Sequence, residues 1–237
     1  MPNSKVFRYG FSLGLILLIS SCAGILGPDV KPGLQLAEAG DHKGALAHYE
    51  SMMKEEKANA KVYRLAFEAA FRSGKRVTAS KYYANALEAG YDQESLKSLA
   101  VELWYERAKW VMGAQRWKDA RQAGEAISNL DPGSKEDKFC RLILQGKTKF
   151  DKGNHKGLWD AVADYHDAAN LNPDSGLPFF LMGQARYKNN RSDYDAALED
   201  YYKALEIEPN GSFSKEAKAD IKKIEAVKKK MKGFWGK

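Results

Sequence analysis

Residues 178–210 read PFFLMGQARYKNNRSDYDAALEDYYKALEIEPN, and they contain the clearest copy of a pattern that recurs along the chain. Ala197, Tyr201 and Ala204 are spaced by four and by seven residues, which places them on one face of a helix. Small residues on that face let a second helix approach closely. Pro209 follows, and proline cannot continue the hydrogen-bond ladder of a helix. The stretch therefore predicts two packed helices, the second of which ends before Pro209.

The same spacing recurs along the chain. Alanines 34, 41, 41 and 36 residues apart set a frame, and they are Ala45, Ala79, Ala120, Ala161 and Ala197. The residues four positions later are Tyr49, Tyr83, Gly124, Tyr165 and Tyr201. The residues seven positions later are Met52, Ala86, Ile127, Ala168 and Ala204, and prolines close the last three units at 132, 173 and 209. A unit of this kind cannot bury its apolar face alone, so neighbouring units are expected to stack.

This frame resembles the tetratricopeptide repeat (TPR), over roughly residues 31–210 and in five helix pairs. The resemblance implies an all-α fold, a right-handed solenoid over residues 31–212. The first pair has a short leading helix and lacks a closing proline. The third pair has seven extra residues, which predict a lengthened first helix through ESLKSLAVELWYERAKWVMG, residues 94–113.

Residues 213–237 predict a basic amphipathic C-terminal helix. They hold nine lysines and three acidic residues, whereas residues 22–212 hold 27 basic and 28 acidic side chains. Apolar residues recur at spacings of three and four, and they are Ala217, Ile221, Ile224, Val227 and Met231. The favoured interpretation is the cap that a solenoid needs at its open end. The alternative is a helix that touches anionic lipid, with Phe234 and Trp235 at the interface.

Residues 1–21 have the pattern of a signal peptide: Lys5 and Arg8, an apolar run from Phe11 to Ile19, and small residues after it. The run is shorter than the about 20 residues of a membrane span. Residues 19–22, ISSC, resemble the lipobox of a bacterial lipoprotein, which implies that Cys22 carries palmitate-type acyl chains and that residues 22–30 form a short tether. The alternative is an ordinary secretory signal cleaved near Ala23.

The lipoprotein resemblance implies a place in the bacterial cell envelope. In a Gram-negative cell, this would be the periplasmic face of the outer membrane. An exported chain has no access to cytoplasmic nucleic acid, so we expect no nucleic-acid partner.

No catalytic pattern is found in the sequence. The chain has no HExxH, GxSxG, phosphate loop or CxxC, and its four histidines show no i, i+4 pair. We therefore expect no enzyme activity, no cofactor and no metal. Cys140 lies in FCRLIL and is expected to be a small core residue rather than a reactive thiol.

In the TPR family, the first helix of each pair lines a concave groove that binds a protein partner. Carrying those positions over gives candidates that combine cations with aromatic rings: Arg64, Glu68, Arg72, Tyr105, Lys109, Lys147, Phe150, Phe180, Gln184, Tyr187 and Lys188. They predict a partner segment with acidic and apolar residues. The alternative is an ordinary solvated face.

Several classes of TPR lipoprotein fit this description. Size, lipobox and contiguous repeats favour a pilotin-like scaffold that assists assembly of an envelope machine such as a type IV pilus secretin. The lipoprotein of the outer-membrane barrel-assembly machinery has the same resemblance. Two further classes remain open: an accessory lipoprotein of a transporter that holds a small molecule, and a structural envelope protein.

Overall fold

The computed structural model describes residues 29–189 and 194–235, and over these ranges the chain is all-α. The predicted signal peptide (1–21), Cys22 and all but the last two residues of the tether lie outside the described residues. The chain divides into two compact units, Met1–Leu96 and Lys97–Lys237, with the boundary inside one helix. Within the described ranges, helices form five consecutive pairs followed by one further helix, which confirms the predicted helix-repeat class.

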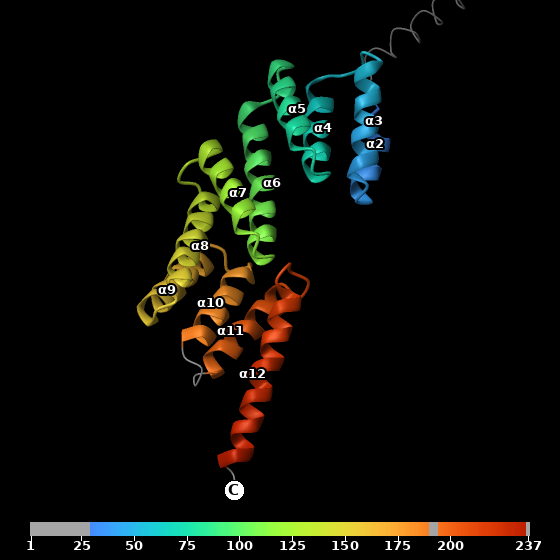
Figure 1. The fold of residues 1–237 in the computed structure, drawn as a ribbon. Coiled ribbons are helices and arrows are strands. Elements are labelled where there is room, and N and C mark those ends of the chain that lie inside the picture. Colours follow the sequence, from blue (N-terminus) through green and yellow to red (C-terminus); the bar gives the residue numbers. More distant parts are fainter. Residues whose placement is uncertain (1–28, 190–193, 236–237) are drawn as a thin grey trace, which may run out of the picture. The chain divides into compact units, whose positions relative to one another are not determined.

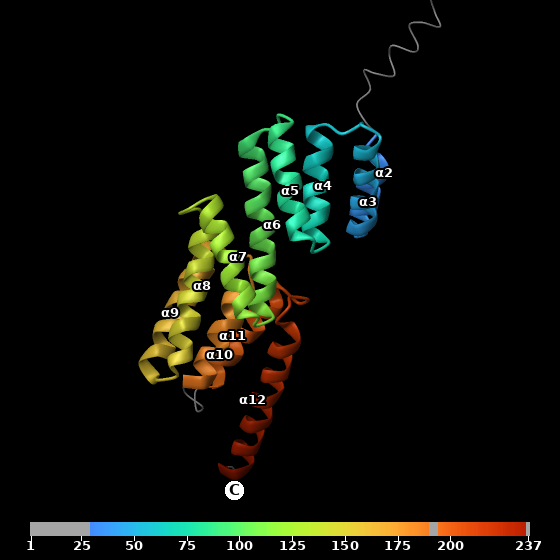
Figure 2. The ribbon, with the colours of Figure 1, turned by 45° about the horizontal axis from the view of Figure 1, so that its top comes forward.

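Unit 1 contains two helix pairs (Figures 1 and 2). The first consists of α2 (Lys31–Glu38) and α3 (His42–Lys54), the second of α4 (Ala60–Arg72) and α5 (Arg76–Glu88). Asp41 and Asn59 cap α3 and α4, since their side chains accept hydrogen bonds from backbone N–H groups three residues later. Gly40 and Gly74, with φ of 81° and 85°, follow the first helix of each pair and allow the tight turn.

Unit 2 contains the remaining helices. They are α6 (Gln93–Gly113), whose first turn belongs to unit 1, α7 (Trp117–Leu130), α8 (Lys135–Lys152), α9 (His155–Leu171), α10 (Leu177–Asn189), α11 (Tyr194–Ile207) and α12 (Ser214–Trp235). The predicted lengthening of the third pair is confirmed, because α6 has 21 residues. Pro132, Pro173 and Pro209 each lie two residues beyond the end of a second helix, as predicted.

The alanine frame lies in the core of both units. All five frame alanines are at most 2% exposed, and so are four of the five residues seven positions later, the exception being Met52 at 6%. Of the tyrosines in the frame, only Tyr83 is half-buried, with its ring 5.5 Å from that of Phe67. The frame is therefore the surface through which the two helices of each pair pack.

Unit 2 closes on itself where α6 ends. The Ser212 hydroxyl donates to the Trp110 carbonyl at 2.8 Å, and the Gln115 amide donates to Glu216 at 2.7 Å. Phe213, beside Ser212, is 2% exposed and stacks on Phe180 with ring centroids 5.1 Å apart. The end of α6 thus packs on the loop between α11 and α12, about 100 residues away in sequence.

The N-terminal half of α12 covers the core of unit 2. Ala217, Ile221 and Ile224 are buried in the same core as α6 to α11. Further along, Val227 is half-buried and Met231 is 42% exposed. The first half of the helix therefore packs as a cap does.

An Asp137 network holds the turn between α7 and α8. The Asp137 carboxylate is fully buried and accepts hydrogen bonds from the Arg141 guanidinium at 2.6 and 2.9 Å, from the Gly133 N–H at 2.7 Å and from the Ser128 hydroxyl. These donors, Arg141 foremost, lower the pKa of Asp137 to about 2 although burial opposes the shift. The ionised carboxylate is therefore part of the folded state.

Enlarging Ala197 should destabilise unit 2. Its side chain is fully buried, so Ala197→Leu is expected to lower the free energy of unfolding by about 1 to 3 kcal/mol through overpacking. Ala226→Leu, at an exposed position of α12, is the matched control. Urea unfolding monitored by circular dichroism measures both. Equal stability of the two variants would show that the repeat frame is misplaced.

The Asp137 carboxylate should make stability pH-dependent. Its pKa is lowered from 3.8 to about 2 in the folded chain, so the ionised form contributes about 2 kcal/mol at neutral pH, and this contribution is lost as the pH falls from about 4 to about 2. Asp137→Asn should therefore lower the free energy of unfolding most above about pH 4. Below that pH, the difference in this free energy between the variant and the wild type should shrink. Urea unfolding across this range measures the difference, with Asp174→Asn at an exposed site as control. A pH-independent difference would contradict the assignment.

Candidate functional site

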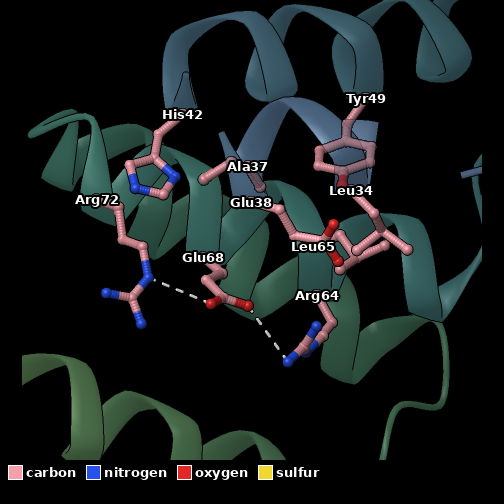
Figure 3. Close-up of a pocket in the computed structure, with 10 residues that line it drawn as sticks. Leu34, Ala37, Glu38, His42, Tyr49, Arg64, Leu65, Glu68 and Arg72 are labelled. Carbon is pink, nitrogen blue, oxygen red and sulfur yellow. Dashed lines mark hydrogen bonds and ion pairs between the residues drawn. The ribbon is translucent and has the colours of Figure 1, made fainter. Parts of the chain in front are cut away.

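A pocket of about 300 Å³ in unit 1 is the leading candidate site (Figure 3). Helices α2, α3 and α4 supply its walls. It is lined by Leu34, Ala37, Glu38, His42, Tyr49, Arg64, Leu65, Glu68, Ala69 and Arg72. All three groove residues predicted on α4 therefore line one pocket.

The polar wall of the pocket is a ladder on α4. A spacing of four places Arg64, Glu68 and Arg72 on one helical face. Glu68 Oε2 lies 3.3 Å from Arg64 Nη2, and Glu68 Oε1 lies 3.2 Å from Arg72 Nε. The three side chains are 27 to 29% exposed, so water and a ligand can reach them. Such exposed ion pairs contribute at most about 1 kcal/mol each to stability, so a ligand can compete with them for the guanidinium groups.

Tyr49 and His42 complete the pocket from α3. Tyr49 is 1% exposed, yet its hydroxyl has no hydrogen-bond partner among the described residues, and the same is true of His42 Nδ1. Burial raises the pKa of Tyr49 above its ordinary value, and the Glu68 charge adds to this while Arg64 opposes it. Buried polar groups are normally paired. Two such groups at one pocket therefore point to a ligand or water that satisfies them.

The electrostatic character of this pocket differs from the cationic groove expected from the sequence. Arg64 and Arg72 are balanced by Glu68 and by Glu38, so the lining carries no formal net charge. Leu34, Leu65 and the two alanines supply an apolar surface beside the charged ladder. The pocket therefore suits an apolar group next to hydrogen-bond acceptors.

The remaining candidates belong to unit 2 and are engaged by their own neighbours. Tyr105 accepts a hydrogen bond from the Asn172 amide at 2.7 Å, and the Lys109 ammonium lies 5.0 Å from its ring centroid. Burial raises the pKa of Tyr105 well above its ordinary range. Gln184 donates to Glu216 at 3.1 Å, and the rings of Tyr187 and Tyr194 lie 6.1 Å apart.

Lysines also lie over two further aromatic rings in unit 2, those of Trp117 and Phe150. Lys147 Nζ lies 5.2 Å from the Trp117 ring centroid and 5.7 Å from that of Phe150, and Lys188 Nζ lies 4.3 Å from the Phe150 ring. Lys147 also pairs with Asp151 and is only 16% exposed. Because the chain's own cations occupy these rings, the rings are poor contact points for a partner.

Phe180 is not a groove residue, and this prediction is wrong. Its side chain is fully buried, between Tyr201 and Phe213 in the core of unit 2. The cause is the closure of unit 2 around the end of α6, which places the α11–α12 loop over the inner face of α10.

Further cavities in unit 2 differ from the pocket in unit 1. One, of about 210 Å³, is lined by Glu106, Lys109, Trp110, Leu177, Glu208, Asn210, Gly211, Ser212 and Phe213. Another, of about 400 Å³, lies between α7 and α8 beside Cys140. Cys140 is 1% exposed, which confirms its prediction as a core residue, and burial raises the pKa of its thiol to about 12.

The structure contains features that sequence reasoning missed. The repeat frame explains Tyr49 as a packing residue, and His42 lies three residues before the frame alanine Ala45. A signal was present in His42, a polar side chain at a position that holds a large hydrophobic or aromatic residue in three other repeats. Trp110, 52% exposed beside the 210 Å³ cavity, had no signal beyond its place on a long helix.

The part of the chain that the structure describes contains neither a candidate metal site nor a candidate membrane span. Among residues 29–189 and 194–235, no three His, Cys, Asp or Glu side chains are grouped as metal ligands. In the same ranges, no helix combines the length and hydropathy that crossing a bilayer requires.

Comparison with known proteins finds similarity at the level of solved structures. No family model matches the chain, and no curated protein is significantly similar to it. YrrB, described as a TPR protein with an unusual peptide-binding site, is 18% identical, with 80% of this chain and 90% of YrrB covered and a TM-score of 0.40. MamA from Desulfovibrio magneticus RS-1 is 14% identical, with 76% of this chain and 92% of that chain covered and a TM-score of 0.41. The helix pairs are defined by the helix bounds and the buried residues between the helices, independently of these scores.

Proposed function

We propose that this protein is a membrane-anchored TPR scaffold that binds a segment of a protein partner in the pocket of unit 1. The observation that carries the proposal is the gathering of the Arg64–Glu68–Arg72 ladder with the buried, unpartnered hydroxyl of Tyr49 at one cavity. No nucleophile with an adjacent base lines this cavity, so its chemistry is that of recognition.

The pocket's chemistry indicates the kind of segment it takes. Leu34 and Leu65 would contact an apolar side chain of the partner. Carbonyl or carboxylate oxygens beside that side chain would accept hydrogen bonds from Arg64 and Arg72, whose guanidinium groups have several donors each. The Tyr49 hydroxyl, which can donate and accept, would gain a partner. An extended or helical peptide with an apolar anchor and neighbouring acceptors satisfies all three.

The proposed anchor is the lipidated Cys22, supported by residues 19–22 of the sequence. Because α2 begins at Lys31, eight residues separate Cys22 from the first described helix, a reach of under about 30 Å. Leu34, Ala37 and Glu38 of that helix line the pocket. A partner bound there would stand close to the bilayer, which favours a component of an envelope assembly and hence a pilotin-like role.

Photocrosslinking in cells tests the pocket directly. A photoreactive phenylalanine derivative at Ala37, which lines the pocket, should give a discrete adduct with another protein. The same probe at Ala47, an exposed alanine on the neighbouring helix α3, is the matched control and should give none. Adduct formation from Ala47 alone would place binding outside the pocket.

Charge reversal in the pocket should weaken that adduct. Arg64→Glu in the Ala37 probe background should lower its yield about tenfold, the equivalent of about 1.4 kcal/mol. Lys61→Glu changes the charge equally at an exposed position of α4 and should have little effect. Immunoblots of irradiated cells measure both yields. Equal adduct yields in the two variants would show that the ladder is not part of the binding site.

The lipid anchor has its own test. Cys22→Ala should move the protein from the membrane fraction to the soluble fraction or leave it unprocessed, because two or more acyl chains anchor stably and a polypeptide without them does not. Fractionation and the intact mass of the mature protein measure this. An unchanged membrane partition with a normal mature mass would exclude lipidation at Cys22.

A further inference from the structure

The charges of α12 are divided between its two sides. Its three acidic residues are all turned toward the rest of unit 2. Glu216 accepts hydrogen bonds from Gln115 and Gln184, Asp220 accepts one from Tyr201 at 3.2 Å, and Glu225 accepts one from Tyr202 at 2.7 Å. The carboxylates are thus occupied by α10, α11 and the residues after α6.

The side of α12 that faces away from its buried residues carries lysines, with Glu225 at its edge. Five of them are exposed and have no ion-pair partner among the described residues: Lys215, Lys218, Lys222, Lys229 and Lys230. We call these five residues the lysine stripe. At 100° per residue they lie within about 120° of one another around the helix axis, away from buried Ala217, Ile221 and Ile224. At about 1.5 Å per residue the stripe is about 22 Å long.

Packing holds the lysine stripe in place. Three apolar residues of α12 belong to the unit 2 core, and Lys228, outside the stripe, pairs with Asp195 of α11. The cations are therefore presented on a fixed helix rather than a mobile tail. Because residues 22–212 are nearly neutral, the positive charge of the chain after residue 22 is concentrated in the segment that contains the stripe.

From this arrangement we infer that the lysine stripe is a docking surface for anionic phosphate headgroups of a membrane. Lysine is a compact, strongly hydrated charge on a flexible stem, which suits diffuse attraction to a charged surface better than the recognition of one planar group. Residues 214–233 of α12 contain no arginine and no aromatic residue, and none of the three cavities described above includes a residue of α12. The choice of a bilayer over another polyanion rests on the proposed Cys22 anchor, which would hold the chain at a membrane.

This surface differs from the lipid-inserting helix considered from the sequence. The apolar face of α12 is committed to the core as far as Ile224, so that part of the helix cannot also enter the acyl region. The inferred contact is electrostatic. Each lysine near an anionic surface strengthens binding about fivefold, and salt screens the attraction.

Vesicle flotation with unlipidated protein tests the inference. The chain without residues 1–22 keeps every described helix and has neither signal nor acyl chain. It should bind vesicles of phosphatidylglycerol and phosphatidylcholine in equal parts, release them as salt is raised, and not bind phosphatidylcholine alone. Binding of neutral vesicles to the same extent would overturn the inference.

Matched variants locate the surface. Lys218→Gln, Lys222→Gln and Lys229→Gln together should lower binding at least about tenfold. Lys118→Gln, Lys138→Gln and Lys152→Gln remove the same charge from exposed positions of α7 and α8 and should lower it less than about twofold. Glutamine is a good helix former, so circular dichroism should show unchanged helicity in both. Equal losses in the two variants would mean that net charge, not the stripe, drives binding.

Binding of the same protein to polyglutamate and to duplex DNA, each measured separately, distinguishes other polyanions from membranes. Binding to either of them without binding to anionic vesicles would assign the stripe to an acidic protein or to nucleic acid and would overturn the inference. Since no acyl chain is present, the result is independent of whether Cys22 is lipidated. If Cys22→Ala leaves the membrane partition unchanged while the unlipidated protein binds anionic vesicles, the proposed lipid anchor is wrong and the inference about the lysine stripe stands.

Discussion

In three of the five helix pairs, the distance between the helices depends on the packing of a tyrosine ring from one helix against a glycine on the other. The contact occurs between Gly33 and Tyr49, between Gly146 and Tyr165, and between Gly183 and Tyr201. A Cβ atom on Gly33 or Gly146 would lie closer than 3.0 Å to the ring, and one on Gly183 would lie 3.0 Å from it. Real Cβ atoms do not approach aromatic carbons so closely, so any side chain there would push the helices apart. The frame alanines extend the same close approach along each pair.

The same packing also positions one polar group of the candidate site. Tyr49 packs its ring on Gly33, and this places its hydroxyl at the pocket that the α4 ladder lines. The hydroxyl is buried without a partner because the ring position is set by helix pairing rather than by the need to satisfy the oxygen. A structural residue thereby supplies a recognition group. The third pair replaces the tyrosine by Gly124, which lets Leu144 and Cys140 of α8 approach α7 instead.

Much of the fold could be predicted because it depends on local spacing. The frame alanines, the closing prolines and the lengthened α6 are all visible as periodicity, and each has the predicted structural role. Long-range closure could not be predicted in this way. The hydrogen bond from Ser212 to Trp110 joins residues 102 positions apart, and it explains why Phe180 is buried rather than in a groove.

The candidate site was only partly accessible from the sequence. The α4 ladder followed from family positions, whereas Glu38 and His42 join it through the packing of α2 and α3. The Asp137 network could not be predicted from the sequence either, because its donors come from the end of α7, the following turn and the next turn of α8. The charge division of α12 required knowing which helix face is buried, although the lysines themselves were evident.

In these three pairs the glycine and tyrosine contacts set the distance between the helices, and a double-mutant cycle at one of them measures the coupling. The cycle compares Gly146→Ala, Tyr165→Leu and the double variant by urea unfolding of the whole chain. In the wild-type background, Gly146→Ala should cost about 1 to 3 kcal/mol through overpacking. With leucine at 165 the same change should cost much less or become stabilising, because alanine is the better helix former. An equal cost of Gly146→Ala in both backgrounds would contradict the claim.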